Sequence, residues 1–158
     1  MTTPFLARDL RRDEGLRLAA YPDPLTGGAP WTIGYGHTGP EVHARLAWTP
    51  AEAETALIAD IARACALLDG HVPRWRRLDD ARQDVLANMA FNMGWLSADG
   101  AHGLGTFRRA LAAIQAGRWQ EAHDDLLASA WARQVGGRAR RLATQMLTGV
   151  RSPQLETA

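Results

Sequence analysis

The chain has 158 residues and a mass of 17.2 kDa, a length that suits one domain or two small lobes and excludes two independent enzymes. With 46% hydrophobic and 22% charged residues it is expected to be globular rather than disordered or fibrous. The single cysteine excludes an intramolecular disulfide, and without a second thiol or clustered histidines it also argues against the common zinc frameworks, so no metal is expected.

Charge is distributed unevenly along the chain, although the formal net charge is only +1. All 18 basic residues are arginine; residues 1–70 carry 6 arginines and 9 acidic residues, net −3, whereas residues 71–158 carry 12 and 8, net +4. No segment approaches the roughly 18 consecutive apolar residues of a membrane span, and the first residues lack the apolar run of a signal peptide. The sequence predicts a soluble, cytosolic product without stable membrane insertion.

The chain opens with a predicted short helix. Thr3 and Pro4 form an N-cap followed by proline at the first helical position, and Leu6 and Leu10 lie four residues apart. Continuing the same spacing reaches Glu14, which a persisting helix would point along the side of the two leucines. A carboxyl group partly buried in this way is favoured in its neutral form.

A small strand region is predicted next, over residues 16–38. Three prolines exclude a helix there, and the alternation within 16–18 and again within 31–37 predicts short antiparallel strands. In the second run, Thr32 shares a face with Gly34 and Gly36, a face almost bare of side chains. A strand usually lacks side-chain packing on one face because another backbone or a ligand approaches that face.

The remainder of the sequence predicts helices. Thr49 and Glu52 form a capping box that opens the longest helix, about 30 Å at 1.5 Å per residue, which ends near Gly70. Further helices are expected over residues 80–93, 106–116, 119–127, 129–134 and 138–147.

These elements predict an α+β, mostly helical fold. We expect a small N-terminal lobe with a short antiparallel sheet (about 12–55), a long connecting helix and a larger helical C-terminal lobe (70–150), all within a single domain of residues 1–158. The default position for a ligand is a cleft between such lobes.

Three residues on three different kinds of element could converge on one point: Glu14 at a helix end, Asp23 in a proline-rich turn and Thr32 on a strand. Cleavage of a glycosidic bond needs a protonated carboxylic acid and a second carboxylate that stays ionised. Glu14 suits the first role, and Asp23, in a more hydrated turn, suits the second. On spacing alone, an ordinary helix-end acid and a turn residue explain the same pattern.

The wider strings carry a family resemblance. EGLRL (14–18), YPD (21–23) and WTIGYGH (31–37) resemble the active-site segment of phage-type lysozymes, glycoside hydrolase family 24. NMAFNMG (88–94) resembles the central buried helix of that family, and the segment from GRW (117–119) to GRA (137–139) resembles its C-terminal helices. The resemblance covers most of residues 5–149 and implies a lysozyme-like fold.

The resemblance implies a role for each matching residue. Glu14 would be the general acid, Asp23 the carboxylate that activates water, and Thr32 the hydroxyl that holds that water, in a reaction that inverts the anomeric centre. The family usually has five residues between the Asp and the Thr, whereas this chain has eight. Thr26 in the longer turn is therefore a competitor for the threonine role, although a strand holds the hydroxyl of Thr32 more firmly than a Gly-rich loop.

Four more residues match family positions. Arg138 matches an arginine that pairs with the catalytic Glu, and His37 one that pairs with an acid and fixes the strand to the helical lobe. Phe91 and Asp125 match positions that line the saccharide cleft. On the residues alone, Arg138 is better explained as a solvated charge at a helix start and Phe91 as a core residue, and the alternative for His37 is a half-buried histidine.

The function implied by the resemblance is an endolysin: a muramidase that hydrolyses the β-1,4 bond between N-acetylmuramic acid and N-acetylglucosamine in bacterial peptidoglycan, without a cofactor. We expect a monomer that stays in the host cytoplasm until a holin-type membrane lesion gives access to the wall. A lytic transglycosylase and a non-catalytic glycan-binding protein remain alternatives. A nucleic-acid binder, suggested by the arginines within 74–77 and 138–141, is disfavoured by the near-neutral total charge.

Overall fold

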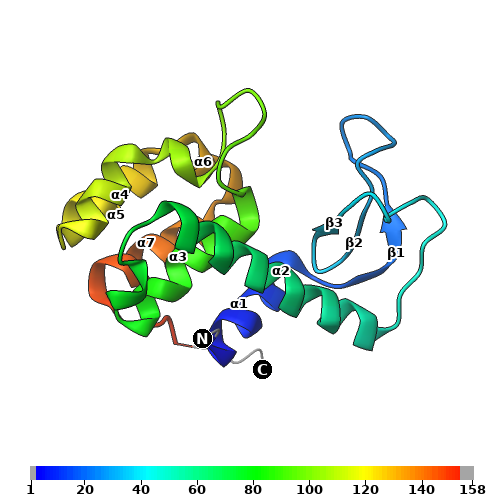
Figure 1. Ribbon diagram of the computed structural model, residues 1–158, viewed down its shortest axis with the longest axis horizontal. Helices are drawn as coiled ribbons and strands as arrows, with labels where there is room; N and C mark the ends of the chain where they lie inside the picture. Colours follow the sequence, from blue (N-terminus) through cyan, green and yellow to red (C-terminus); the bar gives the residue numbers. More distant parts are fainter. Residues whose placement is uncertain (1–2, 154–158) are drawn as a thin grey trace. The chain divides into compact units, whose positions relative to one another are not determined.

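The computed structural model describes residues 3–153 and divides into a compact unit that ends at Arg63 and a second that begins at Ala64. The described residues form seven α-helices and one three-stranded antiparallel sheet, the latter near the N-terminus (Figure 1). The predicted α+β, mostly helical, lysozyme-like class is therefore confirmed.

Helix α1 (Pro4–Glu14) forms as its sequence predicts and extends to Glu14. The Thr3 hydroxyl accepts a hydrogen bond from the Leu6 amide at 3.2 Å, and Leu6 and Leu10 are both buried. Gly15 ends the helix at a φ of +69°, and its N–H donates to the Arg11 carbonyl. A positive φ suits glycine, so the helix stops directly after the glutamate.

The sheet consists of β1 (Arg17–Tyr21), β2 (Thr32–Gly34) and β3 (His37–Thr38), in that spatial order. The expectation of one continuous strand over 31–37 is wrong, because the chain reverses at residues 35–36 and Ile33 pairs with His37 across a tight hairpin. Gly34 and Gly36 both take a positive φ, which lets the backbone turn where the alternation of the sequence suggests a straight strand.

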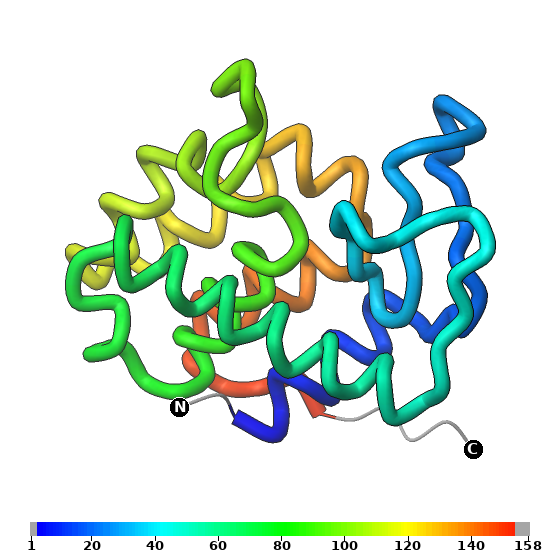
Figure 2. Tube along the Cα trace, turned by 45° about the vertical axis from the view of Figure 1, so that its right-hand side comes forward, coloured from blue at the N-terminus to red at the C-terminus, as the bar shows by residue number. Residues whose placement is uncertain are grey.

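The turn between β1 and β2, residues 22–31, stands out from the strands (Figures 1 and 2). On its other edge β1 is covered by residues 46–48, since the Ala20 amide donates to the Leu46 carbonyl and the Trp48 amide to the Leu18 carbonyl. The short sheet thus has hydrogen-bonded neighbours on both edges of its first strand.

Helix α2 (Pro50–His71) is the longest helix of the described chain, with 22 residues. The predicted capping box is confirmed: the Thr49 amide donates to Glu52 Oε2 at 2.7 Å, and the Glu52 amide donates back to Thr49 Oγ1 at 3.3 Å. None of the helices within residues 3–153 combines the length and the apolar character that a bilayer span requires.

The unit that begins at Ala64 is helical. Helix α7 packs against three other helices, and α3 is buried from Asp84 to Ala90, as expected for a central helix. The elements in chain order are η1 (Trp75–Arg77), α3 (Asp80–Met93), η2 (Leu104–Thr106), α4 (Arg108–Gln115), α5 (Trp119–Ala128), α6 (Ala130–Val135) and α7 (Gly137–Thr148).

One helix start was predicted two residues too early. The sequence places it at Thr106, but Thr106 belongs to the 3-10 turn η2, and its hydroxyl donates to the Gly103 carbonyl at 2.7 Å. The side chain that looks like a cap therefore closes the preceding turn, and α4 begins at Arg108.

Candidate active site

Glu14 is the last residue of α1, and its side chain is half-buried. A Cβ atom added to Gly36, in the turn between β2 and β3, would lie only 2.9 Å from Glu14 Oε2. Gly34 is similarly close to Trp48, whose ring would lie 3.0 Å from such an atom. Gly34 and Gly36 do not share one strand face, because the chain reverses between β2 and β3. Neighbouring side chains nevertheless approach the backbone at both glycines, and at Gly36 the approaching group is the Glu14 carboxylate.

Asp23 organises the turn that follows β1. Its Oδ1 accepts hydrogen bonds from the amides of Leu25 (2.7 Å) and Thr26 (3.1 Å). Its backbone also closes the turn, since the Asp23 amide donates to the Gly28 carbonyl and the Gly27 amide donates to the Asp23 carbonyl. These bonds fix the carboxylate through one oxygen and leave Oδ2 without a hydrogen bond from the described residues.

The two candidate threonines have different surroundings. Thr26 uses its hydroxyl inside the turn, where it donates to the Ala29 carbonyl at 2.9 Å and accepts from the Gly28 amide at 3.2 Å. Thr32 begins β2, is half-buried, and its hydroxyl has no hydrogen-bond partner among residues 3–153. Of the two, Thr32 is the hydroxyl that is available to a water molecule.

The register of the sheet shows where Glu14, Asp23 and Thr32 lie along β1 and β2. Tyr21 of β1 pairs with Thr32 of β2, so Asp23, two residues beyond Tyr21, leaves the sheet at the end where Thr32 lies. At the other end Arg17 pairs with Gly34, close to Gly36 and therefore to Glu14. Strand β1 thus separates the two carboxylates, with the hydroxyl on the side of Asp23.

A hydrogen-bonded cluster links α1, the hairpin turn and α2 next to Glu14. Arg11 donates to both oxygens of Glu54 at 2.8 and 2.7 Å, and the Tyr35 hydroxyl donates to Glu54 Oε1 at 3.0 Å. The bond from Arg11, followed by the one from Tyr35, lowers the pKa of Glu54. Burial, and then the bond to Glu54, raises the pKa of Tyr35.

His37 is buried between two carboxylates. Its Nδ1 lies 2.8 Å from Asp60 Oδ2 on α2, and its Nε2 lies 2.6 Å from Glu41 Oε1. Arg63 also forms an ion pair with Asp60. Both carboxylates can accept a hydrogen bond from the ring only when both of its nitrogens carry a proton. The contacts connect β3 to α2.

In the unit that begins at Ala64, Arg138 lies at the start of α7 and is buried, with Nε donating to Asn88 Oδ1 at 2.9 Å. The alternative of a solvated helix-start charge is therefore wrong. Phe91 lies on α3 and is half-buried, in contrast to the fully buried residues that precede it.

Asp125 has a contact that sequence spacing does not show. Its Oδ2 accepts from the amide of Ala110 at 3.1 Å, which caps the N-terminal turn of α4 from α5. Asp125 also lines a pocket of about 300 Å³, together with Phe107, Trp131 and Gln134 among others. Phe107 and Trp131 meet edge to face in its wall.

Sequence reasoning did not identify Asp60 as the partner of His37 or Asn88 as the partner of Arg138. It also did not single out Glu54, the partner of Arg11 and Tyr35. Glu41, four residues after His37, was the one partner that close spacing could have indicated. No group of three His, Cys, Asp or Glu side chains within the described chain is arranged to hold a metal ion.

Comparison with known proteins agrees with this fold. The family model of phage lysozyme matches residues 11–147, and the chain belongs to the phage lysozyme family, a family of lysozyme-type peptidoglycan hydrolases. The chain is also similar to the pre-baseplate central spike protein Gp5 of Enterobacteria phage T4, with 34% identity over 168 aligned residues. The alignment covers 91% of this chain and 28% of that protein, so the chain spans less than a third of its relative.

Proposed function

We propose that this chain is a muramidase that hydrolyses the β-1,4 bond between N-acetylmuramic acid and N-acetylglucosamine in peptidoglycan, with inversion. The observation that carries the proposal is the position of Glu14: a half-buried carboxylate at the end of α1, held against the backbone of Gly36 within the segment that resembles the family's active site. Residues 1–158 would form one catalytic domain.

Glu14 acts as the general acid in this proposal. It transfers its proton to the glycosidic oxygen as the bond from that oxygen to the anomeric carbon breaks, so the leaving sugar departs as a neutral alcohol.

Asp23 and Thr32 serve the attacking water. The Thr32 hydroxyl orients the water, and Asp23 Oδ2 accepts its proton as the water oxygen bonds to the anomeric carbon from the opposite face. The two amides that donate to Asp23 Oδ1 hold the carboxylate in one orientation for this role. An inverting site needs room for a water between the sugar and the base, and the separation of Asp23 from Glu14 by strand β1 is consistent with that need.

Four further residues have supporting roles in the proposal. Arg138, buried and oriented by Asn88, would pair with the catalytic glutamate, and His37 would fix β3 to α2 through Asp60. Phe91 and Asp125 would contact the saccharide. The chemistry uses only these side chains and a water molecule, so it requires no cofactor.

The biological setting we propose is that of an endolysin, a monomer that accumulates in the host cytoplasm and reaches peptidoglycan through a holin-type membrane lesion. The similarity to a phage spike protein favours a second setting, in which a longer protein carries this lysozyme unit as part of the virus particle. Immunodetection of the chain in purified particles, compared with the lysate of the same infected cells, distinguishes the two.

The test of the activity is the clearing of a purified cell-wall suspension by the wild type, by Glu14→Gln and by the matched control Glu121→Gln, whose side chain is exposed and pairs with Arg118. Removing a general acid should slow clearing by about 10²- to 10⁴-fold, and the control should clear like the wild type. Equal clearing by all three proteins would show that Glu14 is not the acid.

Product analysis separates the proposal from the transglycosylase alternative. Hydrolysis yields reducing sugar ends, whereas a lytic transglycosylase yields an anhydro sugar and needs only the acid. Full activity of Asp23→Ala with anhydro products would replace the muramidase by the transglycosylase.

A further inference from the structure

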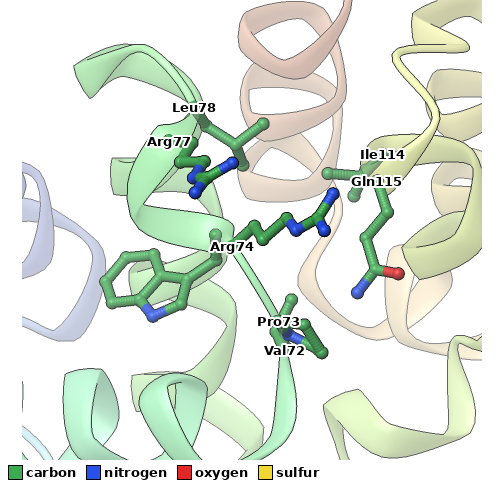
Figure 3. A pocket seen from close by; sticks show the side chains of 8 residues that line it. Val72, Pro73, Arg74, Arg77, Leu78, Ile114 and Gln115 are labelled. Atoms are coloured by element: carbon green, nitrogen blue, oxygen red, sulfur yellow. The ribbon is translucent and has the colours of Figure 1, made fainter.

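A second pocket, of about 500 Å³, lies between residues 72–78 and the C-terminal end of α4 (Figure 3). Three of its lining residues, Val72, Trp75 and Ile114, are almost fully buried and give it apolar walls. Its polar side-chain groups are two guanidinium groups, one amide and the indole N–H of Trp75, which donates to Asp69. All the lining residues belong to the unit that begins at Ala64, and no residue proposed for catalysis is among them.

The two guanidinium groups belong to Arg74 and Arg77. Neither side chain has an ion pair or a hydrogen bond within residues 3–153, whereas Arg76 between them is bound to both oxygens of Asp69 at 2.7 and 2.8 Å. In Figure 3, Arg74 extends across the pocket toward Ile114 and Gln115. The pocket therefore contains two positive charges without an internal counter-ion.

The backbone of Arg74 is also unusual. Its φ of +62° and ψ of +12° lie in the left-handed region, and it is the one non-glycine residue of the described chain with a positive φ. Glycine would adopt this conformation with less strain. Strained backbone of this kind is concentrated at ligand clamps and other functional positions.

We propose that this pocket binds an oxyanion, a carboxylate or a phosphate group, carried by a ligand with a small apolar group. Arg74 and Arg77 would hold the oxyanion, the Gln115 amide would donate a further hydrogen bond, and the apolar group would pack against Val72 and Ile114. The site is separate from the proposed catalytic residues and does not depend on their activity.

A nucleic-acid backbone fits these observations less well. Such a backbone needs a row of available cations along a surface, and only two arginines of the 74–77 run are available, both within one pocket. A discrete anion matches the number and the confinement of the charges.

Titration of the full chain followed by NMR tests the proposal without any measurement of hydrolysis. The probes are N-acetyl-alanyl-alanine for the carboxylate, its uncharged amide as the matched control, and phenyl phosphate for the phosphate. We expect saturable shifts of the backbone amides of Leu78 and Gln115 with at least one anion and none with the amide; the anion that binds more tightly identifies the source of the oxyanion.

Substitutions of the two arginines test whether their side chains cause the NMR shifts. Arg74→Gln and Arg77→Gln should each weaken binding by about tenfold or more, as expected for the loss of a charged hydrogen bond. Arg109→Gln, an exposed arginine on α4 outside the pocket, is the matched control and should bind as the wild type does. Arg74→Gly should relieve the backbone, so that the midpoint of thermal unfolding does not fall while binding is lost.

Three results would overturn the proposal: no saturable shift with either anion, equal shifts with the uncharged amide, or unchanged affinity in both glutamine variants. Binding of a short DNA duplex that depends on Arg74, with no response to the small anions, would replace it by a nucleic-acid site.

Discussion

The carboxylate of Glu14 lies against the α-carbon of Gly36, so close that a methyl group at Gly36 would come within 2.9 Å of Glu14 Oε2. The general acid that we propose is therefore positioned by the absence of a side chain in the turn between β2 and β3. This contact links the end of α1 to the hairpin and explains why a glycine stands at this place in the site.

Gly36→Ala should reduce wall-clearing activity by about 10- to 100-fold, because the new methyl group displaces the carboxylate from its position. It should also destabilise the fold by about 1 to 2 kcal/mol, since the φ of +74° is strained for alanine. Gly100→Ala is the matched control, with a φ of +70° and open space around the added methyl group. Gly100→Ala should lose a similar free energy of unfolding in urea denaturation but keep its activity. Equal activity of the two variants would contradict the proposed role of Glu14.

Thr26→Ala should lower kcat by about 3- to 10-fold with little change in KM, because two hydrogen bonds that shape the Asp23 turn are lost. Thr26→Ser keeps the hydroxyl and should restore the rate. Leu25→Ala, at a side chain that is 95% exposed, should behave as the wild type. A serine variant as slow as the alanine variant would show that the hydroxyl does not position Asp23.

Asp125→Ala should lower the free energy of unfolding by about 1 kcal/mol, the usual loss when a helix N-terminus loses its side-chain acceptor. Asp125→Asn keeps an oxygen for the Ala110 amide and should be nearly as stable as the wild type. Asp124→Ala on the exposed side of the same helix provides the comparison. If the charge of Asp125 contacts the saccharide, KM should rise in both Asp125 variants; a normal KM in both would leave it only the capping role.

The Arg11–Glu54–Tyr35 cluster predicts a pH dependence of stability. Because the folded pKa of Glu54 lies below its unfolded value of about 4.3, its contribution is present above that pH and is lost as the pH falls through the folded pKa. The exposed position limits the contribution to less than about 1 kcal/mol. The difference in unfolding free energy between wild type and Glu54→Gln should therefore shrink between pH 7 and pH 3; a constant difference would contradict the assignment.

Local sequence signals were sufficient for most of the helices. Thr3 with Pro4, and the reciprocal pair Thr49 and Glu52, mark helix starts through bonds that involve only neighbouring residues. The hairpin at residues 35–36 was missed because a strand and a hairpin with glycines at alternate positions have the same pattern of side chains. The glycines are informative only once their φ values are known.

The candidate site was predictable only in part, because local patterns do not reveal partners that are distant in the sequence. Half-burial of Glu14 follows from its spacing to Leu10, within one helix. The bond from Arg138 to Asn88 spans 50 positions of the sequence, and the bond from His37 to Asp60 spans 23. No local periodicity encodes contacts over such separations. Such partners depend on how helices pack, which the pattern of one helix does not specify.

The turn after Asp23 has a consequence for natural variation. Its shape is maintained by the side chains of Asp23 and Thr26 and by backbone groups, while the side chain of Leu25 at the tip contributes nothing to it. Homologous proteins are therefore free to vary the side chain at position 25 without disturbing the Asp23 carboxylate, because only the backbone amide of that residue bonds to Asp23.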